Sequence, residues 1–136
     1  MIEQRITRAR ILIDSDRLKE AARELGLALA VDPDHMEAQG LAAFVEMRQG
    51  LHAEAGKSAE RTIALAPDDE WAHFMAGIVA GAAGKTGKAK SCFREALRLD
   101  PGHARTNAAL AQIEAEAGRY EDALDLTTRG LELEPE

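Results

Sequence analysis

The length and charge of this chain bound its fold and exclude several functions. It has 136 residues, the size of one ordinary domain. Its 17 Lys and Arg against 24 Asp and Glu give a formal net charge of -7, whereas a protein whose main ligand is nucleic acid needs a basic surface. We therefore expect no nucleic-acid partner.

No segment has the sequence of a membrane helix or of an export signal. The longest stretch without a formal charge, 71–84, has 14 residues, and a helix that crosses a bilayer needs about 20 apolar residues. The N-terminus, from Met1 to Arg5, is charged and lacks the apolar segment of a secretory signal. We expect a cytoplasmic protein with no direct membrane insertion.

The four prolines reveal an internal repeat. Pro33, Pro67, Pro101 and Pro135 stand 34 residues apart, and each closes a similar segment, such as Ala-Leu-Arg-Leu-Asp-Pro at 96–101. A fixed period of this length indicates a repeat architecture. We predict one domain over 1–136, built from repeats at about 2–35, 36–69, 70–103 and 104–136.

Each repeat is predicted to hold two helices joined by a tight turn. Gly50, Gly84 and Gly118 share one place, where a positive φ can end a helix, and Asp16 is the exception in the first repeat. Each proline then stops the second helix. In chain order, we expect helices at about 2–14, 17–31, 35–48, 52–65, 69–82, 86–99, 103–116 and 120–133. Because every connection is short, the paired helices must be antiparallel, and the repeats should stack into a curved solenoid.

Two places in each repeat hold only small residues. A small side chain lets the backbones of two helices approach where they cross, so these places predict the contact between the two helices of a repeat. The residues are Ala9, Ala43, Gly77 and Ala111 in the first helices, and Ala21, Ala55, Ala89 and Ala123 in the second helices.

This pattern resembles the tetratricopeptide repeat family over practically the whole chain. The resemblance rests on the 34-residue period, the small residue in the first helix, the glycine turn, the alanine that opens the second helix and the closing proline. It implies an all-α fold, a right-handed α-solenoid of four helix-turn-helix repeats with eight helices. At one place where the family often has a large aromatic, the chain has Leu12, Glu46, Ala80 and Glu114. The carboxylates there predict either side chains that reach solvent or a locally rotated helix.

No enzyme signature emerges from the chain. Gly84-Lys85-Thr86 is similar to the end of a phosphate-binding loop, but the motif needs a glycine where Val79 stands and a preceding strand. The four histidines form no pair at the spacing that puts two metal ligands on one helical face. Cys92, the only cysteine, allows no disulfide and is more readily explained as an inert buried thiol. We expect no catalysis, no cofactor and no metal.

The third repeat is the only one with a positive balance, five basic residues against three acidic ones. Lys90, Arg94 and Arg98 recur every four residues along its second helix. This row is either a solvated outer face, the simpler interpretation, or a docking stripe for an acidic partner.

The resemblance implies that the first helices line a concave groove whose residues select a protein partner. The groove would be largely apolar at its centre, with a charged rim, which is typical of a protein-binding surface. We expect Trp71 to be the exposed anchor, whereas Phe44, Phe74 and Ile78 are equally explained by packing between neighbouring helices. The predicted partner-binding residues are Phe44, Met47, Arg48, Trp71, Phe74, Ile78, Arg105 and Gln112.

Two specialised functions of the family are not expected. The groove positions that hold a carboxylate clamp in chaperone-binding members here include Ile6, Leu41 and Met75. The asparagine ladder of the sugar-transferase members is missing, because the chain has one asparagine, Asn107. The predicted function is a non-enzymatic scaffold that binds a peptide or helix of a partner protein, and the alternative is a structural scaffold that forms homo-oligomers.

The last predicted helix, 120–133, has no later helix to cover it. Leu124 and Leu131 are expected on its uncovered side, although Thr127 and Gly130 reduce the apolar patch. A solenoid normally ends in a polar capping helix. We therefore expect either further repeats in a longer protein or docking of this helix onto a second copy.

Overall fold

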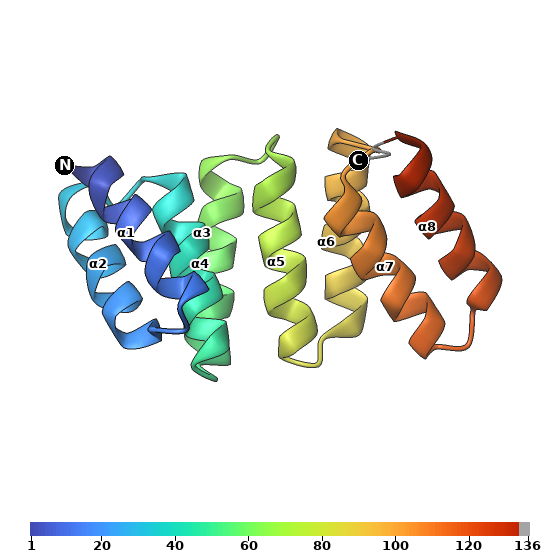
Figure 1. Ribbon diagram of the computed structural model, residues 1–136, viewed down its shortest axis with the longest axis horizontal. Helices are drawn as coiled ribbons and strands as arrows, with labels where there is room; N and C mark the ends of the chain where they lie inside the picture. Colours follow the sequence, from blue (N-terminus) through green and yellow to red (C-terminus); the bar gives the residue numbers. More distant parts are fainter. Residues whose placement is uncertain (134–136) are drawn as a thin grey trace. The chain divides into compact units, whose positions relative to one another are not determined.

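Residues 1–133 form eight α-helices and no strand in the computed structural model, which describes this part of the chain (Figure 1). Every helix begins and ends within one residue of the predicted position, which confirms the all-α repeat fold. The last of the four repeat prolines, Pro135, lies outside the described residues. The helices are α1 (Ile2–Asp14), α2 (Leu18–Val31), α3 (Met36–Arg48), α4 (His52–Leu65), α5 (Glu70–Ala82), α6 (Thr86–Leu99), α7 (Ala104–Glu116) and α8 (Tyr120–Leu133).

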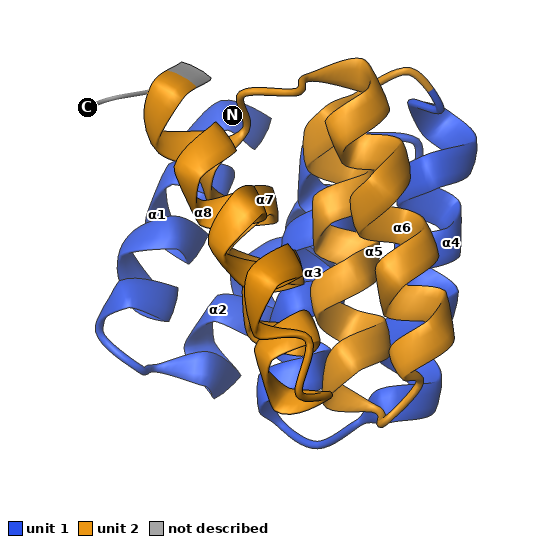
Figure 2. Cartoon of the chain, turned by 90° about the vertical axis from the view of Figure 1, so that its right-hand side faces the viewer, with its two compact units in different colours: residues 1–67 blue, residues 68–136 orange. Residues whose placement is uncertain are grey.

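The chain divides into two compact units of two repeats each (Figure 2). Unit 1 covers Met1–Pro67 and contains α1 to α4, and unit 2 begins at Asp68 and contains α5 to α8. Inside each repeat the first helix packs on the second. Inside each unit the second helix of one repeat also packs on the first helix of the next, α2 on α3 and α6 on α7.

All four turns inside the repeats have the same backbone geometry. Gly50, Gly84 and Gly118 have φ angles of 80°, 79° and 83°, and Asp16 adopts the same left-handed region at 60°. In the second repeat the amide of Gly50 donates to the Met47 carbonyl, and the amide of Leu51 donates to the Glu46 carbonyl. These two bonds satisfy carbonyls that the helix end leaves free. The prediction of glycine turns is confirmed, and the aspartate accepts the same conformation.

Small residues lie at the predicted helix crossings. Ala9 and Ala21 in unit 1, and Ala89 in unit 2, are fully buried. Gly77 shows why one crossing needs a glycine: a Cβ built there would lie 2.5 Å from Cδ1 and 2.9 Å from Cζ of the buried Phe93 ring. The side chain opposite therefore sets the size that each crossing tolerates.

Histidine side chains cap two of the first helices. Nδ1 of His35 accepts a hydrogen bond from the Ala38 amide at 3.2 Å, and Nδ1 of His103 accepts one from the Thr106 amide at the same distance. In α5 the carboxylate of Asp69 has this role. Each cap satisfies one of the amides that the first turn leaves free, so His35 and His103 have a structural function that the sequence analysis did not predict.

Candidate functional site

The predicted partner-binding residues lie on first helices in both units. Unit 1 contributes Phe44, Met47 and Arg48 from the C-terminal half of α3. Unit 2 contributes the others from α5 and α7. These are Trp71, Phe74 and Ile78 on α5, and Arg105 and Gln112 on α7.

Arg48 is held in place on the face of unit 1. Its guanidinium carbon lies 5.7 Å from the centroid of the Phe44 ring, a cation–π distance. Its Nη2 donates to Oδ1 of Asp16 at 2.7 Å, from the turn that follows α1. Phe44 and Met47 are half-buried beside it. An exposed guanidinium fixed in this way loses little freedom when it binds a ligand.

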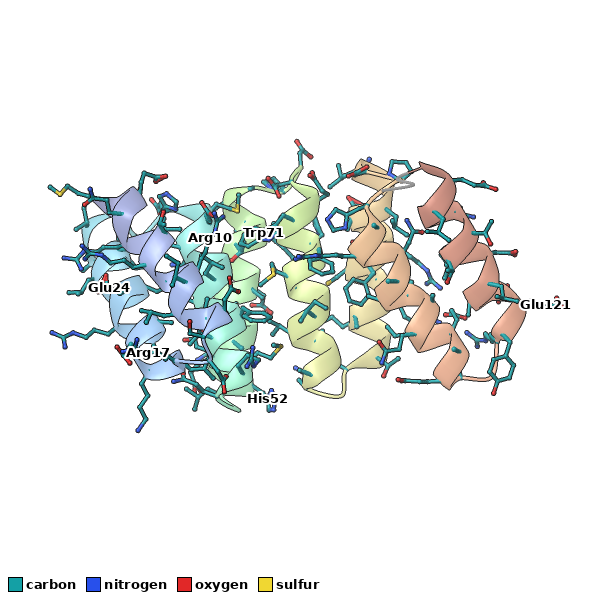
Figure 3. The ribbon with its side chains drawn as sticks, in the orientation of Figure 1. Arg10, Arg17, Glu24, His52, Trp71 and Glu121 are labelled. Atoms are coloured by element: carbon teal, nitrogen blue, oxygen red, sulfur yellow. The ribbon has the colours of Figure 1, made fainter. Side chains whose placement is uncertain are left out.

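Two further side-chain contacts, one of them an ion pair, join α1 to the start of α3. Arg10 pairs with Glu37 (Arg10 is labelled in Figure 3). Nε2 of His35 lies 3.3 Å from Oε1 of Glu3. The pairs bring together residues about thirty positions apart and cross from one repeat to the next. The first helices of unit 1 therefore present charged and polar side chains near a partly accessible aromatic and a methionine.

Phe74 packs inside unit 2. Its side chain is 8% exposed, and its ring centroid lies 5.2 Å from that of His103 and 6.1 Å from that of Phe93. These contacts favour the packing alternative for this residue. Trp71 lies in the first turn of α5 and is labelled in Figure 3. Both Trp71 and Ile78 are half-buried.

On α7 the two predicted side chains are exposed. Arg105 lies in the first turn of the helix, and the amide of Gln112 donates to Glu116 at 3.1 Å. The accessible predicted groups of unit 2 are thus an indole, an isoleucine, a guanidinium and an amide.

The basic row on α6 is largely neutralised by acidic partners. Nζ of Lys90 lies 2.9 Å from Oε1 of Glu114, and Arg98 donates through both Nε and Nη2 to the carboxylate of Glu95. Among the described residues, only Arg94 in this row makes no ion pair. The row is therefore a poor candidate for a free docking stripe.

Glu114 is buried and paired, which the sequence analysis did not predict. Its carboxylate accepts hydrogen bonds from Lys90 and from Nη1 of Arg119, the latter at 3.2 Å. These two donors hold the pKa of Glu114 below its ordinary value. Glu46, at the same place in the second repeat, accepts a hydrogen bond from the Ser58 hydroxyl at 2.7 Å. The carboxylates thus join the two helices of their repeats, and α7 is not rotated, because Ala111 remains buried at its crossing.

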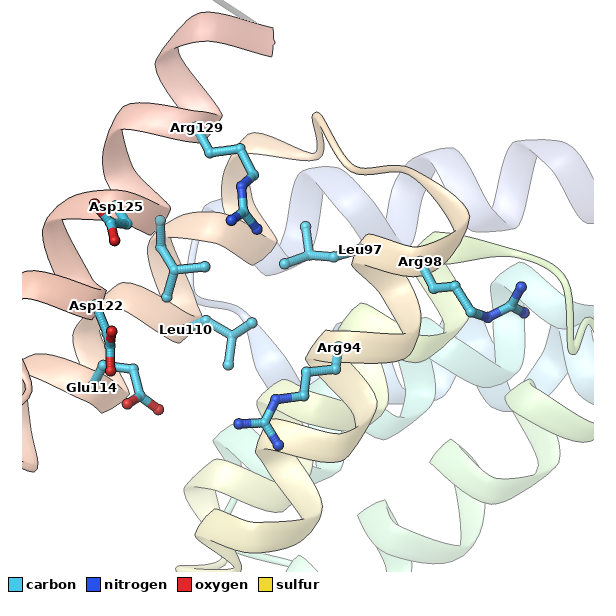
Figure 4. A pocket seen from close by; sticks show the side chains of 9 residues that line it. Arg94, Leu97, Arg98, Leu110, Glu114, Asp122, Asp125 and Arg129 are labelled. Carbon is cyan, nitrogen blue, oxygen red and sulfur yellow. The ribbon is translucent and has the colours of Figure 1, made fainter.

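Unit 2 also has a hollow of about 450 Å³ between α6, α7 and α8 (Figure 4). Three leucines contribute its apolar lining, while the charged groups are evenly divided between the two signs. Such a balance suits neither a phosphate nor a simple cation. The sequence analysis missed this hollow because its lining comes from three helices. The residues are Leu97, Leu110 and Leu126, with Arg94, Arg98 and Arg129 and with Glu114, Asp122 and Asp125.

No three His, Cys, Asp or Glu side chains within residues 1–133 lie where they could hold a metal ion. Burial raises the pKa of the Cys92 thiol, which disfavours its reactive thiolate form. None of the described helices is long and apolar enough to cross a membrane.

Solved structures share this fold at low sequence identity. TTC0263, a thermophilic TPR protein of Thermus thermophilus, matches with a TM-score of 0.91 and 20% identity over 100% of this chain and 75% of that one. MamA of Desulfovibrio magneticus RS-1 matches with a TM-score of 0.81 and 20% identity over 99% and 76% of the two chains. A mutant O-GlcNAc transferase of Thermobaculum terrenum matches with a TM-score of 0.86 and 24% identity, over 94% of this chain but only 26% of its own. At these identities the likeness establishes the fold alone.

A family model provides the sequence-level match. No curated protein sequence is similar enough to count as a relative. The model described as the tetratricopeptide repeat matches residues 6–70 and 74–135, nearly the whole chain. Together with the 34-residue period and the eight described helices, this match shows that the chain belongs to the tetratricopeptide repeat family.

Proposed function

We propose that this chain is a non-enzymatic scaffold whose first helices bind a peptide or helix of a partner protein. Membership of a family of protein-interaction repeats supports the general class. The observation that carries the proposal is the arrangement on α3, where Phe44 supports an exposed Arg48 that Asp16 also holds. A fixed cation beside a partly accessible aromatic ring is the kind of anchor that dominates protein interfaces.

The proposed partner contacts differ between the two units. In unit 1, Phe44, Met47 and Arg48 offer an apolar surface next to a cation. In unit 2, Trp71 and Ile78 offer apolar contacts, while Arg105 and Gln112 offer polar ones. Phe74 is assigned to the packing of unit 2 and not to the partner.

Peptides selected from a random library displayed on phage provide the test, with the 136-residue chain as the target. The affinity of each selected peptide is then measured for the wild type, Arg48→Ala and Trp71→Ala. Removal of a central anchor costs about 2 kcal/mol or more, a loss of roughly 30-fold in affinity. The matched control is Arg23→Ala, which removes an exposed arginine from the second helix α2.

If Arg48→Ala and Trp71→Ala both keep the wild-type affinity, with folding intact by circular dichroism, the first helices are not the binding surface. Equal losses in Arg23→Ala and Arg48→Ala would point to general charge attraction instead. Neither outcome is expected, since only Arg48 is fixed by an aromatic ring and a carboxylate.

A further inference from the structure

The outer face of α8 exposes a row of apolar side chains. Tyr120, Leu124 and Leu131 are 68%, 66% and 62% exposed. Their spacing of four and seven residues puts them on one side of the helix. Three large apolar side chains in a row, all with more than half of their surface in water, form a surface that gains free energy when it is covered.

The repeat shows which kind of element covers this face. Leu124 and Leu131 hold the places that Lys90 and Leu97 hold on α6, and α7 packs on α6. In unit 1, α3 packs on α2 in the same way. In both units the outer face of a second helix is covered by a first helix, so the fitting occupant for α8 is also a first helix.

The outer face of α1 also exposes a large apolar side chain. Ile11 is 59% exposed, whereas Val45 at the same place on α3 is 1% exposed. The other first helix that follows a second helix inside its unit is α7, and Ile113 at this place is half-buried there. Ile11 is therefore far more exposed than the residues at the same place on α3 and α7.

The residues that would meet also match chemically. On α6 and α7, Lys90 pairs with Glu114 at 2.9 Å. The equivalent places on α8 and α1 hold Leu124 and Leu12. The ion pair between α6 and α7 thus has a pair of leucines as its counterpart on α8 and α1, which favours contact of the outer face of α8 with α1 of a second copy over contact with α7 of a second copy.

We infer that copies of this chain associate head to tail, with α8 of one copy covering α1 of the next. The inference goes beyond partner binding by the first helices and does not depend on it. Because the two surfaces differ, the contact is heterologous and can add further copies at either end. Three large apolar side chains form a small interface, so the association is weak and increases with protein concentration.

Two charge-insertion variants test the pairing by sedimentation velocity. Ile11→Glu blocks the α1 surface, and Leu124→Glu blocks the α8 surface. Both sites are exposed, so both variants keep the wild-type circular dichroism spectrum. The wild type forms species that grow with concentration, and each variant alone is a monomer. An equimolar mixture forms dimers and nothing larger, because one intact α8 surface and one intact α1 surface remain.

The control is Leu27→Glu, which changes an exposed leucine of α2 that is on neither surface and should assemble as the wild type does. A wild type that remains monomeric at about 200 µM overturns the inference. Dimers in Ile11→Glu alone overturn it in favour of two α8 helices packed on each other. Failure of the variants to pair when mixed also overturns it. None of these readouts depends on peptide binding, so this test and that of the proposed function fail independently.

Discussion

The contact between Gly77 and Phe93 allows the packing of the third repeat to be tested quantitatively. A Cβ at Gly77 would lie 2.5 Å from Cδ1 of the buried Phe93 ring, so Gly77→Ala forces the ring or the helix to move. Overpacking of this kind costs about 1–3 kcal/mol. The same change gains about 1 kcal/mol of helix propensity. We expect a net loss of about 1 kcal/mol in the free energy of unfolding, measured by urea denaturation and circular dichroism.

Gly26→Ala is the matched control. Gly26 lies inside α2, and a Cβ there would meet no atom within 4 Å. The free energy of unfolding of Gly26→Ala should therefore rise by the full difference in helix propensity, about 1 kcal/mol. Because both variants share this gain, the difference between them isolates the cost of overpacking, about 1–3 kcal/mol.

The first repeat supplies the rescue. Ala9 and Leu25 hold the places of Gly77 and Phe93 there, and both are buried. The double variant of Gly77→Ala with Phe93→Leu therefore restores a pair that already packs in this fold. It should be more stable than the sum of the two single changes predicts. Equal stabilisation by Gly77→Ala and Gly26→Ala, or no coupling in the double variant, would refute the reasoning.

Three further predictions follow from the same structure. Ala89→Leu fills the fully buried helix crossing of the third repeat and should cost about 1–3 kcal/mol, whereas Ser91→Leu, on the exposed side of the same helix, should cost little in the same urea experiment. Gly84→Ala puts a side chain at a φ of 79° and should lower the free energy of unfolding by about 1–2 kcal/mol, which thermal melts will detect. The folded-state pKa of Glu114 lies below its ordinary value, so its stabilising contribution is complete above about pH 4.5 and is lost as the pH falls through that lower pKa. The urea midpoints of the wild type and Glu114→Gln should therefore differ at neutral pH and converge in acid, and a constant difference would contradict the pairing.

The sequence alone determined the period, the helices and the turns, because their signals are local. A proline stops a helix wherever it stands, and a glycine such as Gly50 accepts a positive φ without help from the rest of the fold. Ala9 and Ala21 marked a helix crossing since only small side chains let two backbones approach there. Because these signals recur every 34 residues, each helix boundary could be checked against the same place in the other repeats.

The tertiary structure decided how individual side chains are used. In the sequence, Glu114 is an unexpected carboxylate and Lys90 is part of a basic row, and only the packing of α6 on α7 brings them to 2.9 Å. From the sequence Phe74 had two equally good explanations, and the position of its ring against His103 favours packing. Composition and periodicity do not reveal such pairs, because the energy of a pair depends on the distance between two residues far apart in the chain and on how deeply they are buried. The sequence therefore specified where the helices run, and the packing between them specified which side chains are left free to bind.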